Sequence, residues 1–251
     1  CTLMDKQQYG VIGHHLSHSF SEKYFKEKFE KENILDSSYN LFDIDNIEFL
    51  PELIGNIENL QGLNVTIPYK EKALPFLTDI DEIAKQIGAI NTIKISQNKK
   101  QLKGYNTDYF AFKKSLKPFL DINHERALIF GTGGASKAIR SALSDLGISY
   151  KMVSRTLKKD SSLTYQDLNA ETINTHKLLI NTTPLGTFPN VESCLDIDYN
   201  LITENHYCYD LVYNPERTQF LSNCKNNQSK IKNGLEMLQL QAEKSWGIWN
   251  S

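Results

Sequence analysis

RALIFGTGGAS, residues 126–136, carries the strongest structural signal in this chain. An apolar strand pattern runs directly into a glycine-rich turn, and a helical pattern follows over residues 138–143. Such glycines let a pyrophosphate approach the backbone at a helix N-terminus. We therefore predict a dinucleotide-binding strand–turn–helix unit, with cofactor contacts from Gly131, Gly133, Gly134 and Ala135. Ser136 stands where the usual fingerprint has a third glycine, so a tight turn with a purely structural role stays open.

A basic loop follows the next apolar strand, which we expect over residues 149–153. A carboxylate directly after this strand would bind a ribose hydroxyl and repel a 2′-phosphate, but the chain has none there. A guanidinium can instead bind a phosphate through two hydrogen bonds. We therefore predict NADP rather than NAD, bound through Ser154, Arg155, Thr156 and Lys159, with Lys158 sharing the phosphate. A solvated basic loop without a ligand is the alternative.

Length and charge restrict the classes of protein to which the chain can belong. Its 251 residues are near the length at which one core gives way to two domains. The 28 Lys and Arg and 30 Asp and Glu are interspersed and leave a net charge of −2, which argues against nucleic acid or an anionic membrane as partner. No run approaches the roughly 18 to 20 apolar residues of a membrane span. A small-molecule ligand fits this composition better.

The cysteines and histidines indicate neither a metal site nor a disulfide framework. The cysteines are Cys1, Cys194, Cys208 and Cys224, without C-x-x-C spacing, and no two histidines form a ligand pair at helical spacing. Free thiols are typical of a reducing compartment, so we predict a cytoplasmic protein. Residues 1–5 are too short and polar for a signal peptide, and Met4 is a candidate initiator.

Strands and helices alternate before the glycine-rich turn. The periodicity predicts strands over residues 9–13, 38–43 and 60–66, a hairpin of residues 90–96 and 101–105, and helices over residues 21–31, 47–54 and 71–87, the last interrupted at Pro75. This alternation predicts an α/β fold with a mostly parallel sheet covered on both faces.

The polar segment NVTIPYK, residues 64–70, stands at the end of one of these strands. Since proline favours an extended residue before it, we expect Thr66 and Ile67 to finish the strand and Lys70 to open the next helix. Asn–Thr pairs also follow apolar runs in residues 88–92 and 104–108. Turn chemistry alone explains any one such pair, and Asp108 can be read as a helix N-cap.

Together these motifs resemble the shikimate dehydrogenase family, in matching order over residues 9–249. In that family the lysine of N-V-T-x-P-x-K and the aspartate of N-T-D face each other over the reacting carbon, which implies Lys70 and Asp108 as catalytic residues. The family's S-x-S pair, which binds the substrate carboxylate, implies Ser19 and Ser21, although Ser21 is equally a candidate N-cap. The other implied residues are Asn64, Thr66, Asn91, Tyr213 and Gln241 for the substrate, and Asn181, Thr182 and Gly234 for the cofactor.

The resemblance implies reversible reduction of 3-dehydroshikimate to shikimate by NADPH, in aromatic amino acid biosynthesis, with Lys70 and Asp108 as an acid–base pair. It also implies two domains. Residues 1–107 would bind the substrate, completed by a returning C-terminal helix in residues 232–251, and residues 108–231 would form a Rossmann-like NADP domain. A monomer or homodimer is expected. The alternatives are a quinate/shikimate dehydrogenase that also uses NAD, and an inactive NADP-binding sensor.

Overall fold

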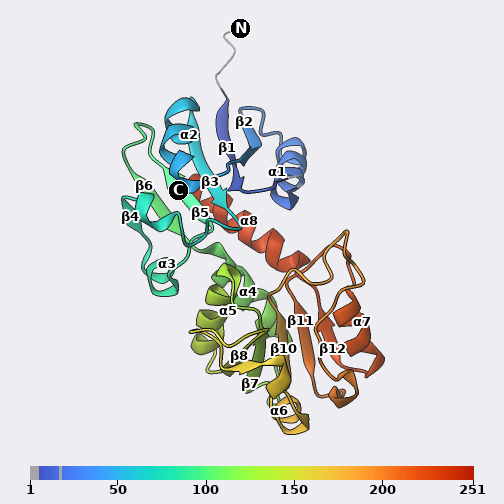
Figure 1. The fold of residues 1–251 in the computed structure, drawn as a ribbon. Coiled ribbons are helices and arrows are strands. Elements are labelled where there is room, and N and C mark those ends of the chain that lie inside the picture. The colour runs from blue at the N-terminus through green and yellow to red at the C-terminus, as the bar shows by residue number, and fades with distance from the viewer. Residues whose placement is uncertain (1–5, 17–18) are drawn as a thin grey trace. The chain divides into compact units, whose positions relative to one another are not determined.

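The computed structural model describes residues 6–16 and 19–251. The chain divides into two compact units, drawn in Figure 1. Unit 1 contains Cys1–Phe110 and Leu238–Ser251, and unit 2 contains Ala111–Met237. The division into functional domains expected above, at residues 107/108 and 231/232, stays a prediction.

Unit 1 is built on a six-stranded sheet in the order β2-β1-β3-β5-β6-β4. The strands are β1 (Gln7–Gly13), β2 (Ser37–Asp43), β3 (Leu60–Val65), β4 (Asp79–Ile80), β5 (Thr92–Ile95) and β6 (Leu102–Tyr105). Its helices are α1 (Phe20–Lys31), α2 (Leu50–Asn56), α3 (Glu82–Ile87), the start of α4 (Thr107–Leu116) and most of α8 (Leu235–Trp249). β1 pairs in parallel with β2 and β3, whereas β5 is antiparallel to both its neighbours. The predicted hairpin of β5 and β6 is confirmed.

Both faces of this sheet are covered because successive side chains of a strand point to opposite faces. Val11 packs in an aromatic cluster with Phe25 and Trp249 on one face. Its neighbour Ile12 packs on the other face, in an aliphatic cluster that includes Leu50. Alternate residues of β1 therefore anchor helices on the two sides of the sheet.

The segment after β3 differs from the sequence-based prediction. Residues 71–87 do not form one helix; they contain a turn, a 3₁₀ turn at Leu74–Phe76, the short strand β4 and then α3. β3 ends at Val65, before Thr66 and Ile67. Across the cis peptide Ile67–Pro68 the Tyr69 amide donates to the Thr66 carbonyl at 2.9 Å. Lys70 therefore lies in a hydrogen-bonded turn and does not open a helix, because this turn is not continued into regular helix.

Unit 2 contains a second six-stranded sheet, in the order β12-β11-β10-β7-β8-β9, with every pair parallel. The strands are β7 (Arg126–Phe130), β8 (Ser149–Ser154), β9 (Leu163–Thr164), β10 (Leu178–Asn181), β11 (Tyr207–Asp210) and β12 (Lys230–Lys232). The helices within the unit are α5 (Gly134–Asp145), α6 (Ala170–Thr175) and α7 (Gln219–Asn226). The strand order reverses between β7 and β10, which is the point where doubly wound sheets bind ligands at their carboxyl ends. The predicted α/β fold with a Rossmann-like part is confirmed.

The described cysteines, Cys194, Cys208 and Cys224, are all free thiols; Cys1 lies outside the described residues. Within residues 6–16 and 19–251, no helix combines the length and the apolar character needed to span a bilayer.

Candidate active site and cofactor loop

Lys70 and Asp108 form an ion pair in unit 1. The Lys70 Nζ atom lies 2.6 Å from Asp108 Oδ2, and the two side chains are 16% and 10% exposed. Asp108 does not cap α4, because the Tyr109 amide is bound by the Asn106 side chain at 3.2 Å; the N-cap interpretation of Asp108 was wrong. Asp108 lies instead in the first helical turn, where the helix dipole favours a negative charge. Its carboxylate is thus free to face Lys70.

Asn91, directly before β5, joins this pair to two helices. Its Nδ2 donates to Asp108 Oδ1 at 3.0 Å, to Thr107 Oγ1 at 2.8 Å and to Gln241 Oε1 at 3.4 Å. Its Oδ1 accepts the Thr107 amide at 2.7 Å and the Thr92 hydroxyl at 3.1 Å. With both ends of its amide engaged, Asn91 fixes the second carboxylate oxygen of Asp108.

Asn64 lies near the end of β3 and belongs to the same polar network. Its Oδ1 accepts the Tyr39 hydroxyl at 2.7 Å, and its Nδ2 donates to Ser245 Oγ at 3.1 Å. Thr66, just beyond the strand, is half-buried, and its amide donates to the Ile12 carbonyl at 3.0 Å. One connected polar network therefore contains these predicted site residues: Lys70, Asp108, Asn91, Gln241 and Asn64.

Ser19 and Ser21 flank the start of α1. Ser19 precedes the helix with extended backbone and makes no side-chain cap hydrogen bond. Ser21 lies within the helix, so the interpretation of Ser21 as an N-cap was wrong, and the two residues do not share one extended segment. The Ser21 side chain lies near the Tyr39 hydroxyl, whose pKa is raised by burial, so that Tyr39 stays a neutral donor to Asn64.

In unit 2 the glycine-rich turn connects β7 to α5. Gly131 has a φ of +106°, which favours glycine, and an added Cβ would lie 2.7 Å from Thr182 Oγ1. Gly133 is the N-cap of α5, and an added Cβ there would meet open space. Ser136, in place of the third glycine, donates its hydroxyl to the Gly133 carbonyl at 2.6 Å. The turn thus leaves room at the N-terminus of a twelve-residue helix.

The basic loop after β8 lies beside this turn. Lys158 Nζ contacts Thr132 Oγ1 at 3.5 Å, so Lys158 reaches the glycine turn. The Ser154 hydroxyl donates to the Thr156 carbonyl at 2.5 Å, which shapes the loop. The side chains of Arg155, Thr156 and Lys159 are exposed. Arg155, Lys158 and Lys159 are cations that suit a phosphate, and Lys158 also contacts the glycine turn.

The end of β10 is held by a buried carboxylate that the sequence analysis missed. Asp210 is fully buried, and burial raises its pKa to about 6. It accepts Asn181 Nδ2 at 2.9 Å and the Thr218 hydroxyl at 2.6 Å. The Thr182 hydroxyl donates to the Phe130 carbonyl at 2.7 Å. The side chains of Asn181 and Thr182 therefore hold the loop that follows β10, opposite Gly131, by hydrogen bonds.

In unit 2, Gly234 lies beside the backbone segment that contains Tyr213. Tyr213 is half-buried, and burial raises its pKa. The Gly234 amide donates to the Val212 carbonyl at 3.1 Å, and an added Cβ would overlap the Leu211 carbonyl. Gly234 therefore permits a close backbone approach beside the Tyr213 segment.

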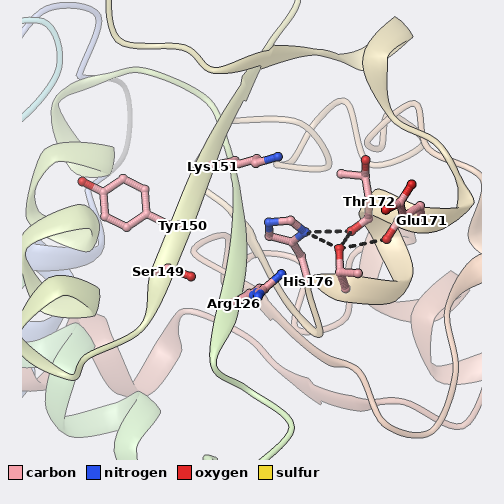
Figure 2. A pocket seen from close by; sticks show the side chains of 8 residues that line it. Arg126, Ser149, Tyr150, Lys151, Glu171, Thr172 and His176 are labelled. Atoms are coloured by element: carbon pink, nitrogen blue, oxygen red, sulfur yellow. Dashed lines mark hydrogen bonds between the residues drawn. The ribbon is translucent and has the colours of Figure 1, made fainter.

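A cavity of about 490 Å³ lies at the opposite, amino ends of β7 and β8. It is lined by Arg126, Ser149, Tyr150, Lys151, Glu171, Thr172, Thr175 and His176. The His176 ring is hydrogen-bonded to the Thr175 hydroxyl and to the Thr172 carbonyl, and burial lowers the pKa of His176. Figure 2 shows His176 beside Thr172 in this cavity. The cavity contains no predicted site residue and lies away from the carboxyl ends where such sheets bind ligands, so it is not the candidate site. Among the residues with a described position, no group of His, Cys, Asp and Glu is arranged to hold a metal ion.

Known proteins share both the sequence and the fold. A family model for the shikimate dehydrogenase substrate binding domain matches residues 11–93. The shikimate dehydrogenase (NADP(+)) of Clostridium beijerinckii is 39% identical over 250 residues, which cover 96% of this chain and 91% of that protein. The chain belongs to the shikimate dehydrogenase family. Further curated relatives, such as that of Caldanaerobacter subterraneus, are also named shikimate dehydrogenase (NADP(+)).

Solved structures of this family match over both units. Shikimate dehydrogenase 1 of Peptoclostridium difficile is 38% identical, with a TM-score of 0.82, and the match covers 97% of this chain and 91% of that one. The Thermus thermophilus enzyme, solved in complex with NADP(H) and shikimate, is 29% identical, with a TM-score of 0.84 and coverage of 97% and 93%. The family resemblance inferred from the sequence is confirmed.

Proposed function

We propose that this chain is an NADP-dependent shikimate dehydrogenase, which interconverts 3-dehydroshikimate and shikimate in aromatic amino acid biosynthesis. The observation that carries the proposal is the Lys70–Asp108 pair at 2.6 Å, with its second carboxylate oxygen bound by Asn91. A family member that had become only a sensor would have no need for this pair. Sequence similarity supports this function through family membership, and the geometry of the pair supports it through the site.

Polar side chains of unit 1 would bind the substrate. Ser19 and Ser21 would donate to the carboxylate of shikimate. Side-chain amides can hydrogen-bond the ring hydroxyls of shikimate, because every amide has both a donor group and an acceptor group. The other proposed substrate contacts in unit 1 are Asn64, Thr66, Asn91 and Gln241. Tyr213, which belongs to unit 2, is proposed as a substrate contact from the family resemblance alone.

Lys70 and Asp108 would move the proton. Oxidation of a secondary alcohol releases one proton from its hydroxyl, and reduction of the ketone requires one for the developing alkoxide. At 2.6 Å the two groups are directly hydrogen-bonded, so we assign the acid–base role to the pair rather than to either residue. Asn91 keeps the carboxylate oriented during the transfer.

The residues of unit 2 fit NADP. The open space at Gly133 and the N-terminus of α5 suit a pyrophosphate, and the loop cations suit a 2′-phosphate. NADP, when bound, supplies or accepts the hydride. The proposed cofactor contacts are Gly131, Gly133, Gly134, Ala135, Ser154, Arg155, Thr156, Lys159, Asn181, Thr182 and Gly234. Lys158 joins this group because it reaches Thr132.

The test is an absorbance assay at 340 nm with shikimate or quinate, each with NADP or NAD. The proposal expects the highest kcat/KM for shikimate with NADP. Comparable values for quinate and NAD would favour the broader quinate/shikimate dehydrogenase. NADP binding without turnover in all four combinations would favour the sensor. The monomer or homodimer and the cytoplasmic location stay predictions, checked by light scattering and fractionation.

A further inference from the structure

Ser245 is a fully buried hydroxyl at the centre of the unit 1 polar network. It lies on α8 and faces three other elements. Its Oγ lies 2.8 Å from Thr92 Oγ1, 3.1 Å from Asn64 Nδ2 and 3.3 Å from Thr107 Oγ1. A single hydroxyl thus connects β3, β5 and the start of α4.

The hydrogen positions in this network follow from the chemistry of its partners. Ser245 donates to the Gln241 carbonyl at 2.9 Å, and a carbonyl oxygen can only accept. Since the one hydroxyl hydrogen of Ser245 is used there, Ser245 acts as acceptor toward the Asn64 amide. Alanine at this position would leave this buried donor without that acceptor.

Tyr39 fixes the other end of the same amide. Its hydroxyl donates to Asn64 Oδ1 at 2.7 Å, and the Ser21 side chain lies nearby. The Asn64 side chain is therefore held at its oxygen by Tyr39 and at its nitrogen by Ser245. Rotating this amide by 180° would break both bonds in a buried setting, where unpaired polar groups are costly.

We propose that Tyr39 and Ser245 are positioning residues of the shikimate site. Tyr39 and Ser245 orient Asn64, and Ser245 also reaches Asn91 through Thr107, which accepts Asn91 Nδ2 at 2.8 Å. Asn91 in turn binds Asp108. The hydroxyl network thus joins Asn64, a proposed substrate ligand, to the proposed catalytic pair. This inference rests on the proposed function, and neither hydroxyl needs to touch substrate.

The test compares Tyr39→Phe and Ser245→Ala with matched controls. Tyr9→Phe removes a hydroxyl from the aromatic cluster that also contains Tyr39. The Tyr9 hydroxyl donates to Gln7 at 3.0 Å and does not belong to the network. Ser115→Ala removes a buried helical hydroxyl in unit 2. We expect each network variant to lower kcat/KM for shikimate about 10-fold, with KM for NADP within about 2-fold, because each loses a buried hydrogen bond that orients Asn64. The controls should change neither value by more than about 2-fold.

A substrate-free measurement accompanies the kinetics. In ¹⁵N spectra, Tyr39→Phe and Ser245→Ala should shift the side-chain amide signals of Asn64, and the controls should leave them in place. Unshifted signals, or kinetic losses equal to those of the controls at matched melting temperature, would overturn the positioning role. If Ser245→Ala does not fold, Tyr39→Phe decides alone. A wild-type chain that does not oxidise shikimate would overturn the proposed function, and the amide signals would still decide whether these hydroxyls orient Asn64.

Discussion

Replacing Lys70 with alanine tests the chemistry most directly. The ammonium group lies 2.6 Å from Asp108 Oδ2, and this carboxylate is its hydrogen-bond partner in the described part of the chain. The substitution removes one member of the proposed acid–base pair, while Asn91 still binds Asp108 Oδ1 at 3.0 Å. The orientation of the carboxylate should therefore survive and the proton transfer should not.

The expected loss is large in kcat and small in KM. A positioned acid or base contributes roughly 10²- to 10⁴-fold, which corresponds to about 3 to 5.5 kcal/mol of transition-state stabilisation. The shikimate KM should rise much less, because the proposed carboxylate and hydroxyl ligands, Ser19, Ser21 and Asn64, stay in place. The loss thus belongs to the chemical step.

The assay follows NADPH at 340 nm under saturating shikimate and NADP, with melting temperatures measured in parallel. Lys72→Ala is the matched control, since Lys72 is two residues away in the same turn and exposed. Its kcat should stay within about 2-fold of wild type, as for an ordinary surface change. A Lys70→Ala enzyme with kcat within about 3-fold of this control would refute the assignment of Lys70 as part of the acid–base pair.

Three further predictions address the cofactor, the buried carboxylate and the substrate carboxylate. Arg155→Ala should raise KM for NADP roughly 10- to 150-fold more than KM for NAD, because only the 2′-phosphate loses a charge-assisted contact; equal rises in steady-state assays would mean a loop-supporting role. The pKa of Asp210 is raised from 3.8 to about 6, so its protonated form stabilises the fold below pH 4 and that contribution is lost as pH rises through 6. In chemical denaturation, Asp210→Asn should therefore gain stability relative to wild type between pH 4 and 7, by an amount of order 3 kcal/mol, and a pH-independent difference would contradict this. Ser21→Ala should raise the shikimate KM about 10-fold or more with KM for NADP unchanged; a lower melting temperature with unchanged shikimate KM would mean a purely structural hydroxyl.

Local patterns predicted most of the fold. The apolar run into Gly131 gave β7, the turn and α5 because strand period, glycine and helix period stand next to each other in the sequence. The two-residue strand β4 was missed, since a strand so short has no periodicity and Pro75 pointed only to a broken helix. Lys70 was placed on a helix for a different reason. A single turn that is not continued has the same local sequence pattern as the start of a helix.

The candidate site was predictable only where motifs are contiguous. Asn64, Asn91 and Asp108 each end an apolar run, so their neighbourhood could be inferred from strand ends. Tyr39 and Ser245 could not, because the residues that they bind lie 25 and 181 positions away and leave no local pattern. The same holds for Asp210, whose role depends on burial rather than on its immediate neighbours.

Unit 1 draws on both ends of the chain, and this sets an order for folding during synthesis. The ribosome releases the strands of its sheet first, while the helix that covers them is still untranslated. Until α8 emerges, the Ile93 carbonyl lacks its bond from the Trp249 indole, and Asn64 lacks Ser245. Unit 2 is continuous from Ala111 to Met237, so it is fully synthesised once the first turn of α8 has been made. The unit that comes later in the sequence can therefore fold first, and the contacts of Asn91 with Gln241 and of Asn64 with Ser245 form only when α8 is added to unit 1.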